Sequence, residues 1–138
     1  MNRPIKFRVW DKITNQYLQE LGIYYWHIPY SLDGEEITGE ANLVGLSELL
    51  KHDNFVTQQY TGLTDSNDNP IYEGDILKIS YGTMGDVIGQ VLYEADEGGY
   101  IFQWERKGPN QHHINLNCDV AFESVIVGNI FEHSELLN

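Results

Sequence analysis

The stretch YEGDILKISY, residues 72–81, decides the fold. Gly74 is predicted to supply a backbone angle that a Cβ would hinder, as glycine does in tight turns. Asp75 then stands where its carboxylate can accept backbone N–H bonds as the chain enters a strand. Residues 76–81 have the β-branched and aromatic content of that strand. The stretch therefore predicts a turn that opens directly into a β-strand.

The chain that follows this stretch is predicted to be β-rich. Strands are expected at residues 87–93, 100–104 and 124–131, because these segments are rich in β-branched and aromatic residues. In the middle strand, the aromatic side chains fall at every second position and therefore share one face. Residues 134–137 are expected to form one helical turn.

Glycine positions connect these strands. Gly-containing turns are expected at residues 82–86 and 95–99, and Gly89, inside a strand, predicts a bulge or a close approach of another backbone. Short strands joined by such turns at this spacing predict a small, strongly bent barrel.

The N-terminal half is predicted to contain further strands. Residues 5–10 alternate in period two and predict a strand with one buried side. Residues 11–15 have turn chemistry, and residues 16–18 are expected to return as the partner strand. Aromatic and β-branched residues predict two more strands, at residues 21–28 and 55–60.

One helix is expected in this half, over residues 43–52, where leucines recur at helical spacing and Ser47 is a candidate N-cap. The sequence thus predicts a mainly β fold with one or two short helices. We expect an N-terminal β-rich subdomain with a short helix, residues 1–58, and a C-terminal barrel subdomain, residues 59–138, with a shared core possible between them.

The composition predicts a globular domain with an acidic surface. The chain has 138 residues and a net charge of −13, but its 41% apolar and 12% aromatic content excludes a disordered acidic tail. This charge argues against a general nucleic-acid binder. It is uneven: residues 1–20 carry +2 and residues 31–75 carry −9. A basic arm therefore precedes an acidic body, and its residues are Arg3, Lys6 and Arg8.

Two roles remain open for this arm. It can lie over the acidic body of its own chain and reduce self-repulsion, or it can dock on a neighbouring copy.

The sequence also indicates the cellular compartment. The single cysteine, Cys118, excludes an internal disulfide, and no apolar segment is long enough for a signal peptide or a transmembrane helix. A cytoplasmic protein is expected.

Three motifs suggest chemistry, and each has a simpler explanation. Residues 65–69 open like a calcium loop, but Pro70 and Ile76 occupy positions that need glycine and glutamate, so a polar Asx turn is favoured. His112 and His113 would point to opposite faces of a strand and would not chelate together. Cys118 has no basic sequence neighbour to activate it as a nucleophile. No catalytic residue, metal ligand or cofactor site is predicted.

Aromatic side chains offer a fourth possibility, the stacking of nucleic-acid bases. Without a basic surround, packing in a core or an interface is the favoured role of these residues. They are Tyr24, Tyr25, Trp26, Tyr100, Phe102 and Trp104.

Three parts of the chain together resemble the YopX family of phage and prophage proteins of Gram-positive bacteria. They are IKFRVWD at residues 5–11, QYTGLTD with IYEGDILK at residues 59–65 and 71–78, and VIVGNIFE with ELL at residues 125–132 and 135–137. The resemblance implies a β-rich architecture whose C-terminal half is a small SH3-like barrel. It implies no established activity, so no catalytic residue is transferred.

The family signature is interpreted as a folding signature rather than an active site. Its residues are Trp10, Tyr60, Gly62, Leu63, Tyr72, Glu73, Gly74, Asp75, Gly128 and Asn129. The glycine-containing pairs among them are typical of turns and bulges.

The sequence favours a non-enzymatic, phage-encoded accessory protein that self-associates and binds a host or phage protein. The alternative is an acidic DNA mimic that inhibits a host nuclease or DNA-binding protein through residues 31–75. An enzyme with an unrecognised site ranks third. A nucleic-acid-binding module ranks last, because only the N-terminal arm could supply a basic face. Neither a membrane nor a cofactor is expected as a partner.

Overall fold

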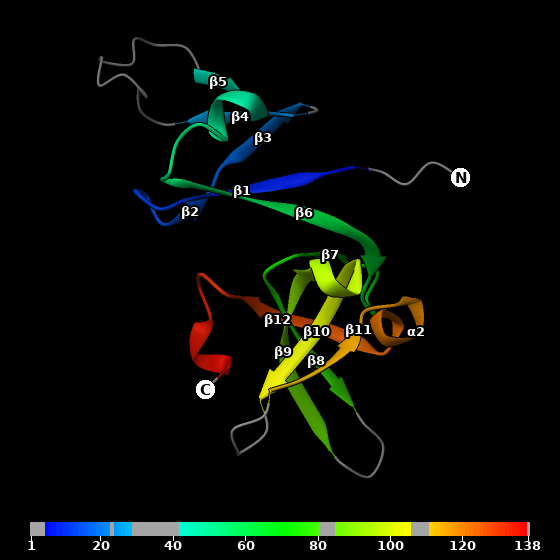
Figure 1. Cartoon of the computed structure of the whole chain (residues 1–138). Coiled ribbons are helices and arrows are strands. Elements are labelled where there is room, and N and C mark those ends of the chain that lie inside the picture. The colour runs from blue at the N-terminus through cyan, green and yellow to red at the C-terminus, as the bar shows by residue number, and fades with distance from the viewer. Residues whose placement is uncertain (1–4, 23, 29–41, 81–84, 106–110, 138) are drawn as a thin grey trace. The chain divides into compact units, whose positions relative to one another are not determined.

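A computed structural model describes residues 5–22, 24–28, 42–80, 85–105 and 111–137 of the chain (Figure 1). The chain divides into two compact units, one spanning residues 6–59 and the other containing residues 60–138. Both are built mainly from antiparallel strands, with two short α-helices among the described residues. The predicted mainly β fold is therefore confirmed.

The N-terminal unit holds two small antiparallel sheets that form a curled half-barrel (Figure 1). Its elements are β1 (Phe7–Asp11), β2 (Gln16–Tyr17), β3 (Gln19–Gly22), β4 (Tyr25–Ile28), β5 (Asn42–Gly45), α1 (Leu46–Leu49) and the first half of β6 (Phe55–Thr64). Strand β1 pairs with β2 and β6, while β4 lies between β3 and β5.

The β1–β2 hairpin follows from the chemistry of Asp11. Its buried carboxylate accepts hydrogen bonds from the Ile13 N–H at 2.9 Å and from the Thr14 hydroxyl at 2.9 Å. Asn15 takes a φ of 56°, in the left-handed region that asparagine tolerates better than most residues. The predicted turn at residues 11–15 is confirmed.

Two predictions in this unit are wrong. The strand expected at residues 21–28 is instead divided between the end of β3 and β4, which pair as a hairpin that reverses around Tyr24 (φ 66°). The helix expected over residues 43–52 is only α1. Residues 42–45 pair with β4 instead, so this tertiary strand pairing overrides the helical spacing. The N-cap is Gly45 rather than Ser47, with no side-chain cap.

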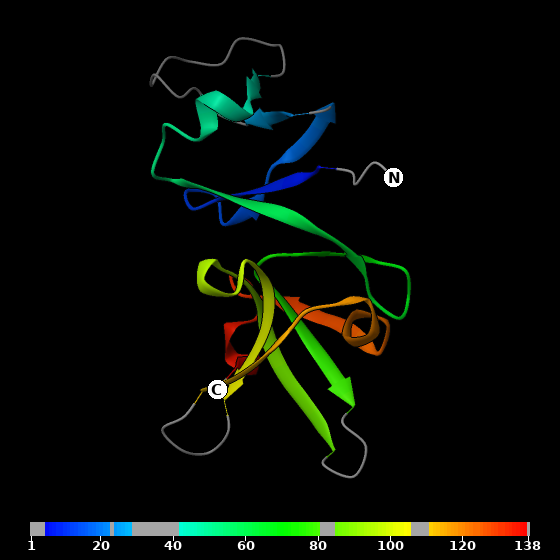
Figure 2. The same ribbon diagram turned by 45° about the vertical axis from the view of Figure 1, so that its right-hand side comes forward.

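The C-terminal unit is a five-stranded antiparallel sheet in the order β11-β10-β9-β8-β12, preceded by a hairpin of β6 and β7 (Figure 2). Its elements are β7 (Pro70–Tyr72), β8 (Asp75–Ser80), β9 (Asp86–Glu94), η2 (Ala95–Glu97), β10 (Gly99–Glu105), β11 (Gln111–Asn115), α2 (Cys118–Phe122), β12 (Ser124–Asn129) and η3 (Ser134–Leu137).

This sheet is open, and the closed barrel predicted from the sequence is not formed by the described strands. Its edges are β11 and β12, and α2 lies in the chain between them. Leu116 and Ala121 from that connection are buried in the core. Side-chain packing therefore takes the place of strand pairing between the two edges.

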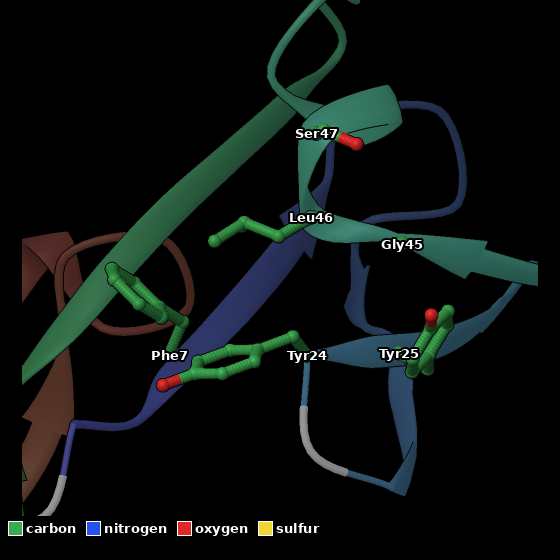
Figure 3. A pocket seen from close by; sticks show the side chains of 6 residues that line it. All are labelled: Phe7, Tyr24, Tyr25, Gly45, Leu46 and Ser47. Carbon is green, nitrogen blue, oxygen red and sulfur yellow. The ribbon is translucent and has the colours of Figure 1, made fainter.

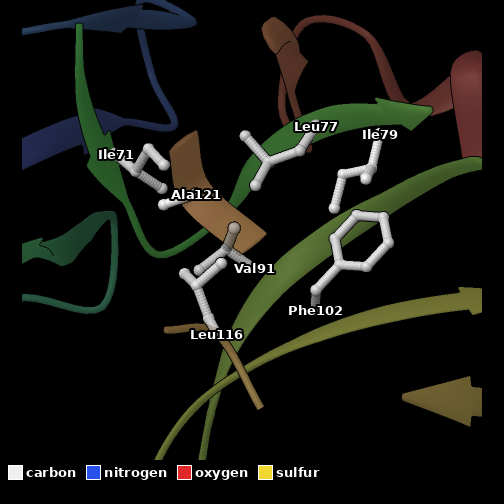
Figure 4. Packing of buried hydrophobic residues seen from close by; sticks show 7 residues of the cluster. All are labelled: Ile71, Leu77, Ile79, Val91, Phe102, Leu116 and Ala121. Atoms are coloured by element: carbon white, nitrogen blue, oxygen red, sulfur yellow. The ribbon is translucent and has the colours of Figure 1, made fainter. Parts of the chain in front are cut away.

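The core of the C-terminal unit fills one side of this sheet. Figure 4 shows seven of its buried side chains gathered together: Ile71, Leu77, Ile79, Val91, Phe102, Leu116 and Ala121. The aromatic side chains at 100 and 104 pack against this cluster, so the predicted shared face of strand β10 is confirmed. The turn expected at residues 82–86 lies mostly outside the described residues, whereas the turn at residues 95–99 is present as η2 and Gly98.

The N-terminal unit has its own core. Its buried members are Val9, Trp26, Ile28, Leu49 and Phe55. Each unit thus buries a separate apolar cluster, which is what defines a unit able to hold its own shape.

Candidate functional site

An open, largely apolar pocket lies in the N-terminal unit (Figure 3). Its volume is about 460 Å³, and its lining residues are Phe7, Tyr24, Tyr25, Gly45, Leu46 and Ser47. Tyr24 and Tyr25 are 40% and 48% exposed, so both rings are in contact with solvent. Aromatic walls with a few hydroxyl groups are typical of sites that take up an apolar group and fix its orientation.

Backbone geometry positions the rings of this pocket. The Leu46 N–H donates to the Tyr24 carbonyl at 3.1 Å, which ties the start of α1 to the β3–β4 turn. The rings of Phe7 and Tyr24 lie 6.3 Å apart at 55°. Gly45 lies beside the Tyr25 ring, where a Cβ would make ordinary van der Waals contact with Tyr25 Cε1 at 3.6 Å. Tyr24 holds a φ of 66°, a strained angle for an aromatic residue, and such strain concentrates at functional sites.

The predicted basic arm is only partly accessible. Arg3 lies outside the described residues, and Lys6 is exposed just before Phe7. The Arg8 Nε donates to Gln58 Oε1 at 2.7 Å, and its guanidinium lies 4.7 Å from the centre of the Tyr17 ring. The side chain of Arg8 is therefore engaged inside its own unit.

The signature residue of the N-terminal unit packs beside this group. Trp10 is buried, and its ring meets the Tyr17 ring edge-on at 5.0 Å. The Tyr17 hydroxyl donates to the same Gln58 oxygen as Arg8, at 2.9 Å. Trp10 and Arg8 thus flank one tyrosine and stabilise the β1–β2–β6 pairing.

The other signature residues lie together in the C-terminal unit. Tyr60 is buried and its ring lies 5.7 Å from that of Tyr72 across the β6–β7 pair. Gly62 has a φ of 89° at the irregularity of that pair, and Leu63 packs against the core. Glu73 is half-buried in the turn that follows.

The turn at residues 72–75 has both features that the sequence predicts. Gly74 has a φ of 85°, and Asp75 Oδ2 accepts a hydrogen bond from the Tyr72 N–H at 2.8 Å. The Gly74 N–H donates to Val91, and its carbonyl accepts from Ile130, at 2.8 and 2.9 Å. The turn thus connects three segments of the unit.

The Gly128–Asn129 pair stabilises the turn that follows strand β12. Asn129 Oδ1 accepts hydrogen bonds from the Phe131 and Glu132 N–H groups, both at 3.0 Å. The Asn129 N–H lies 3.2 Å from His133 Nδ1, and a Cβ on Gly128 would stand 2.6 Å from His133 Cγ. Close packing of the His133 ring therefore requires glycine at position 128.

Replacing Gly74 with valine should lower the thermal midpoint of the C-terminal unit. A β-branched residue at this positive φ costs about 1–3 kcal/mol. Circular dichroism melting curves would measure the change. Gly99→Ala is the matched control, because no atom lies within 4 Å of a Cβ at that position. A midpoint equal to that of the unchanged protein would contradict the structural role of Gly74.

The segment that resembles a calcium loop is an Asx turn. Asp65 Oδ1 accepts from the Asn67 and Asn69 N–H groups at 3.0 and 2.9 Å, and Oδ2 accepts from the Ile126 N–H at 3.0 Å. Burial raises the pKa of Asp65, but these backbone hydrogen bonds together outweigh it and lower that pKa below its ordinary value of 3.8. The favoured interpretation of this turn is confirmed.

The histidine pair has the geometry that the sequence predicts. His112 stacks on Trp104 at 5.9 Å, whereas His113 Nε2 lies 3.3 Å from Glu97 Oε1, so the two rings have different neighbours.

Within the described part of the chain, no group of three or more His, Cys, Asp or Glu side chains is placed to hold a metal ion. Cys118 is an exposed free thiol. No helix in the described ranges is long and apolar enough to span a membrane.

The pocket was not predicted as a site. The sequence marks Tyr24 and Tyr25 as possible stacking residues, but it gives no sign that a turn would bring them beside Leu46 and Ser47. That neighbourhood depends on the pairing of β4 with β5, two strands that are separated in the chain by residues 29–41. Sequence periodicity does not show that strands so separated will pair.

These features define a small antiparallel β protein of two units, with an aromatic pocket in the first and a hydrogen-bonded signature turn in the second. The chain belongs to the YopX family, whose sequence model, described as "YopX protein", matches residues 6–138. Its fold is similar to the crystal structure of protein EF1440 from Enterococcus faecalis, with a TM-score of 0.58 and 22% sequence identity over 99% of this chain and 100% of that one. A comparison with curated proteins gave no significant match.

Proposed function

We propose that the chain is a phage- or prophage-encoded accessory protein that acts without catalysis, by binding other protein molecules, including copies of itself, in the bacterial cytoplasm. The observation that carries this proposal is the aromatic pocket of the N-terminal unit. The YopX family membership supplies the phage context.

The pocket is suited to an apolar side chain of a protein partner. Phe7, Tyr24 and Leu46 offer apolar surface from three separate elements, and the exposed tyrosines add hydroxyl groups at the rim. Tyrosine is enriched at protein interfaces because one ring buries a large area and still donates a hydrogen bond. Contiguous exposed apolar surface rimmed by polar groups marks interaction sites.

The sheet of the C-terminal unit supports an SH3-like arrangement as the finer description of that unit. Its last strand, β12, returns to pair with its first, β8, after a meander through β9, β10 and β11. We infer that this unit is the scaffold and that the N-terminal unit carries the binding site.

The acidic alternative, a DNA mimic built on residues 31–75, has less surface charge than the sequence implies. Asp65 and Asp75 in that segment are 3% and 2% exposed and accept backbone hydrogen bonds inside the C-terminal unit. Their carboxylates therefore stabilise turns and are not presented to a basic partner.

Sedimentation velocity tests the proposal. The chain should self-associate as its concentration rises from micromolar to several hundred micromolar. This association should persist at high salt, because burial of apolar surface is not screened by ions. A single monomeric species throughout would contradict self-association. Strong, salt-sensitive binding to basic DNA-binding proteins, with no self-association, would favour the acidic alternative.

A further inference from the structure

The five-stranded sheet of the C-terminal unit has a second buried face, opposite its core. Side chains alternate between the two faces of a strand, so Ile76 and Ile101 point away from the core cluster, which contains their neighbours Leu77 and Phe102. Ile76 and Ile101 are nevertheless 0% and 2% exposed. Other parts of the chain therefore shield this second face from solvent.

The chain end supplies part of that cover. Paired residues of neighbouring strands share a face, and Gly128 pairs with Ile76. A Cβ on Gly128 would lie 2.6 Å from His133 Cγ, so the His133 ring lies on the second face. The turn η3, which follows His133, packs against β9 (Figure 1). We call residues 130–137 the C-terminal strap.

The His133 ring is fixed from two directions. The Asn129 N–H donates to Nδ1 at 3.2 Å, so in the neutral ring the hydrogen is carried by Nε2. From the strand side, Gly128 lies against the ring, since an added Cβ would also be 2.7 Å from Nδ1. The ring therefore cannot slide toward β12 to relieve a change at Nδ1.

The backbone of His133 holds the strap as well. Its N–H donates to the Asn129 carbonyl at 2.9 Å, and its own carbonyl accepts from the Leu136 N–H at 3.0 Å. At the start of the strap, the Ile130 N–H donates to the Gly74 carbonyl at 2.9 Å. Because residues 130–137 consist of turns and η3, docking of the strap depends on the hydrogen bonds around Asn129 and His133.

Protonation of His133 would place two donors against each other. Histidine gains its second proton between about pH 8 and pH 5. A hydrogen on Nδ1 would point at the Asn129 N–H, which now donates to that nitrogen. A ring released from the strand has no such conflict, so a proton binds the released state more readily. The strap is therefore docked at the higher pH, and acid shifts the equilibrium toward release.

The charged groups around the strap do not offset this conflict. Those of the strap, of β8, β9 and β12, and of the turn at residues 72–75 are Glu73, Asp75, Lys78, Asp86, Glu94, Glu132 and Glu135. Among the described residues, none of these carboxylates lies within 4.0 Å of a His133 nitrogen. Glu132, the neighbour in sequence, accepts a hydrogen bond from Asn129 Nδ2 at 3.0 Å instead.

We propose that residues 130–137 are an acid-released strap. Protonation of His133 at Nδ1 breaks its contact with Asn129 and frees the strap from the face that carries Ile76 and Ile101. The device is contained in the C-terminal unit and does not depend on self-association.

Hydrogen exchange of the natural chain tests the release. It is measured at low micromolar concentration, at about pH 7.5 and about pH 5.5, as protection relative to the unfolded peptide at the same pH. Asp65 stays ionised in this window, because its pKa lies below 3.8. Protection of the strap should fall by about tenfold at the lower pH, whereas peptides from β8 and β10 should keep theirs. Equal strap protection at the two pH values would overturn the proposal.

His133→Asn tests which group takes up the proton. Asparagine Oδ1 is attached to Cγ as Nδ1 is, so it can accept the Asn129 N–H, and it does not titrate. The strap of this variant should stay protected at both pH values. His113→Gln is the matched control, because His113 lies beside Glu97 and away from the strap, and it should keep the acid release. An acid release in His133→Asn equal to that of the natural chain would remove His133 from the mechanism.

Gly128→Ala should reproduce the acid state at neutral pH. The added Cβ would stand 2.6–2.7 Å from the Cβ, Cγ and Nδ1 atoms of His133 and displace the ring. The strap should then be unprotected at both pH values, while Gly99→Ala should behave as the natural chain. Natural protection in the Gly128 variant would contradict a ring held against this glycine.

Nuclear magnetic resonance of the natural chain tests the geometry without any substitution. The ring nitrogen chemical shifts of His133 at about pH 7.5 should report the Nε2–H tautomer, with Nδ1 as the acceptor. A hydrogen on Nδ1 at that pH would overturn the proposal, even if every variant failed to fold.

Discussion

Gly89→Ala is expected to unfold the C-terminal unit, or to lower its thermal midpoint further than Gly74→Val does. A Cβ at this position would collide with the Gln103 carbonyl oxygen and would lie 2.9 Å from both the Gln103 carbonyl carbon and Phe102 Cε2. Two of these atoms belong to backbone in the centre of the sheet and cannot rotate away. Overpacking of this kind costs about 3 kcal/mol or more.

The close approach lies at the end of the β9–β10 pairing. The last pair of that register is Gln90 opposite Gln103, and the Gln103 carbonyl lies against Gly89, the residue next to Gln90. Either part of the sequence prediction, a bulge or a close approach, would have been consistent with glycine here, and the structure shows the close approach.

Hydrogen exchange followed by peptide mass spectrometry would locate the effect. Peptides from β8, β9 and β10 should lose protection in Gly89→Ala, and the melting midpoint of that unit should fall by roughly 10–20 °C. Gly99→Ala, at the start of β10, is the control and should leave both unchanged. Full protection of β9 and β10 in the Gly89 variant would refute the close approach.

Asp65→Asn should be the second most damaging change. An asparagine oxygen can still accept the Asn67 and Asn69 N–H groups. Its NH₂ group would then face the Ile126 N–H, so two donors would meet where a carboxylate oxygen now accepts at 3.0 Å. The substitution removes a charged acceptor and leaves the Ile126 N–H without an acceptor. Together these two effects should lower the free energy of unfolding by about 2–4 kcal/mol.

The same residue makes the stability depend on acid. The folded-state pKa of Asp65 lies below its unfolded value, so its contribution is complete above the unfolded pKa, near 3.8. It is lost as the pH falls through the folded pKa. The difference in unfolding free energy between the natural chain and Asp65→Asn should therefore be largest near neutral pH and should shrink as the pH falls below about 4.

Urea unfolding at several pH values would measure this difference. Asp68→Asn is the control, because Asp68 is exposed and its φ of 65° suits asparagine. A gap between natural chain and Asp65→Asn that stays constant from neutral to acidic pH would show that the carboxylate charge has no part in stability.

Local features of the fold could be predicted, because they depend on a few neighbouring residues. The turn at residues 72–75 is encoded by Gly74 and Asp75 alone, and the turn at residues 11–15 by Asp11 and Asn15. The polar turn at Asp65 is also encoded locally. Its carboxylate has a long-range role as well, since it accepts a hydrogen bond from the Ile126 N–H, 61 positions away.

The features that could not be predicted depend on distant pairing. Leucine spacing at residues 43–50 is equally compatible with a helix and with a strand followed by a short helix. The pairing of β5 with β4, in which Val44 lies opposite Trp26, selects the strand followed by a short helix. The pocket has the same origin, since Tyr24 and Leu46 meet only after that pairing forms. Strand spacing alone predicts a closed barrel, because it does not show that β11 and β12 stay at the edges of the sheet while Leu116 and Ala121, from the chain between them, are buried in the core.

The long-range pairing also has a consequence for the kinetics of folding. Arg8 and Gln58 meet across 50 positions in the N-terminal unit, and Asp65 meets Ile126 across 61 in the other. The hairpins between β8 and β11 are local and can form early, whereas these closures carry a loop-entropy cost before they gain contacts. During synthesis, β1 and β8 therefore each keep one edge unpaired until their distant partners, β6 and β12, have left the ribosome.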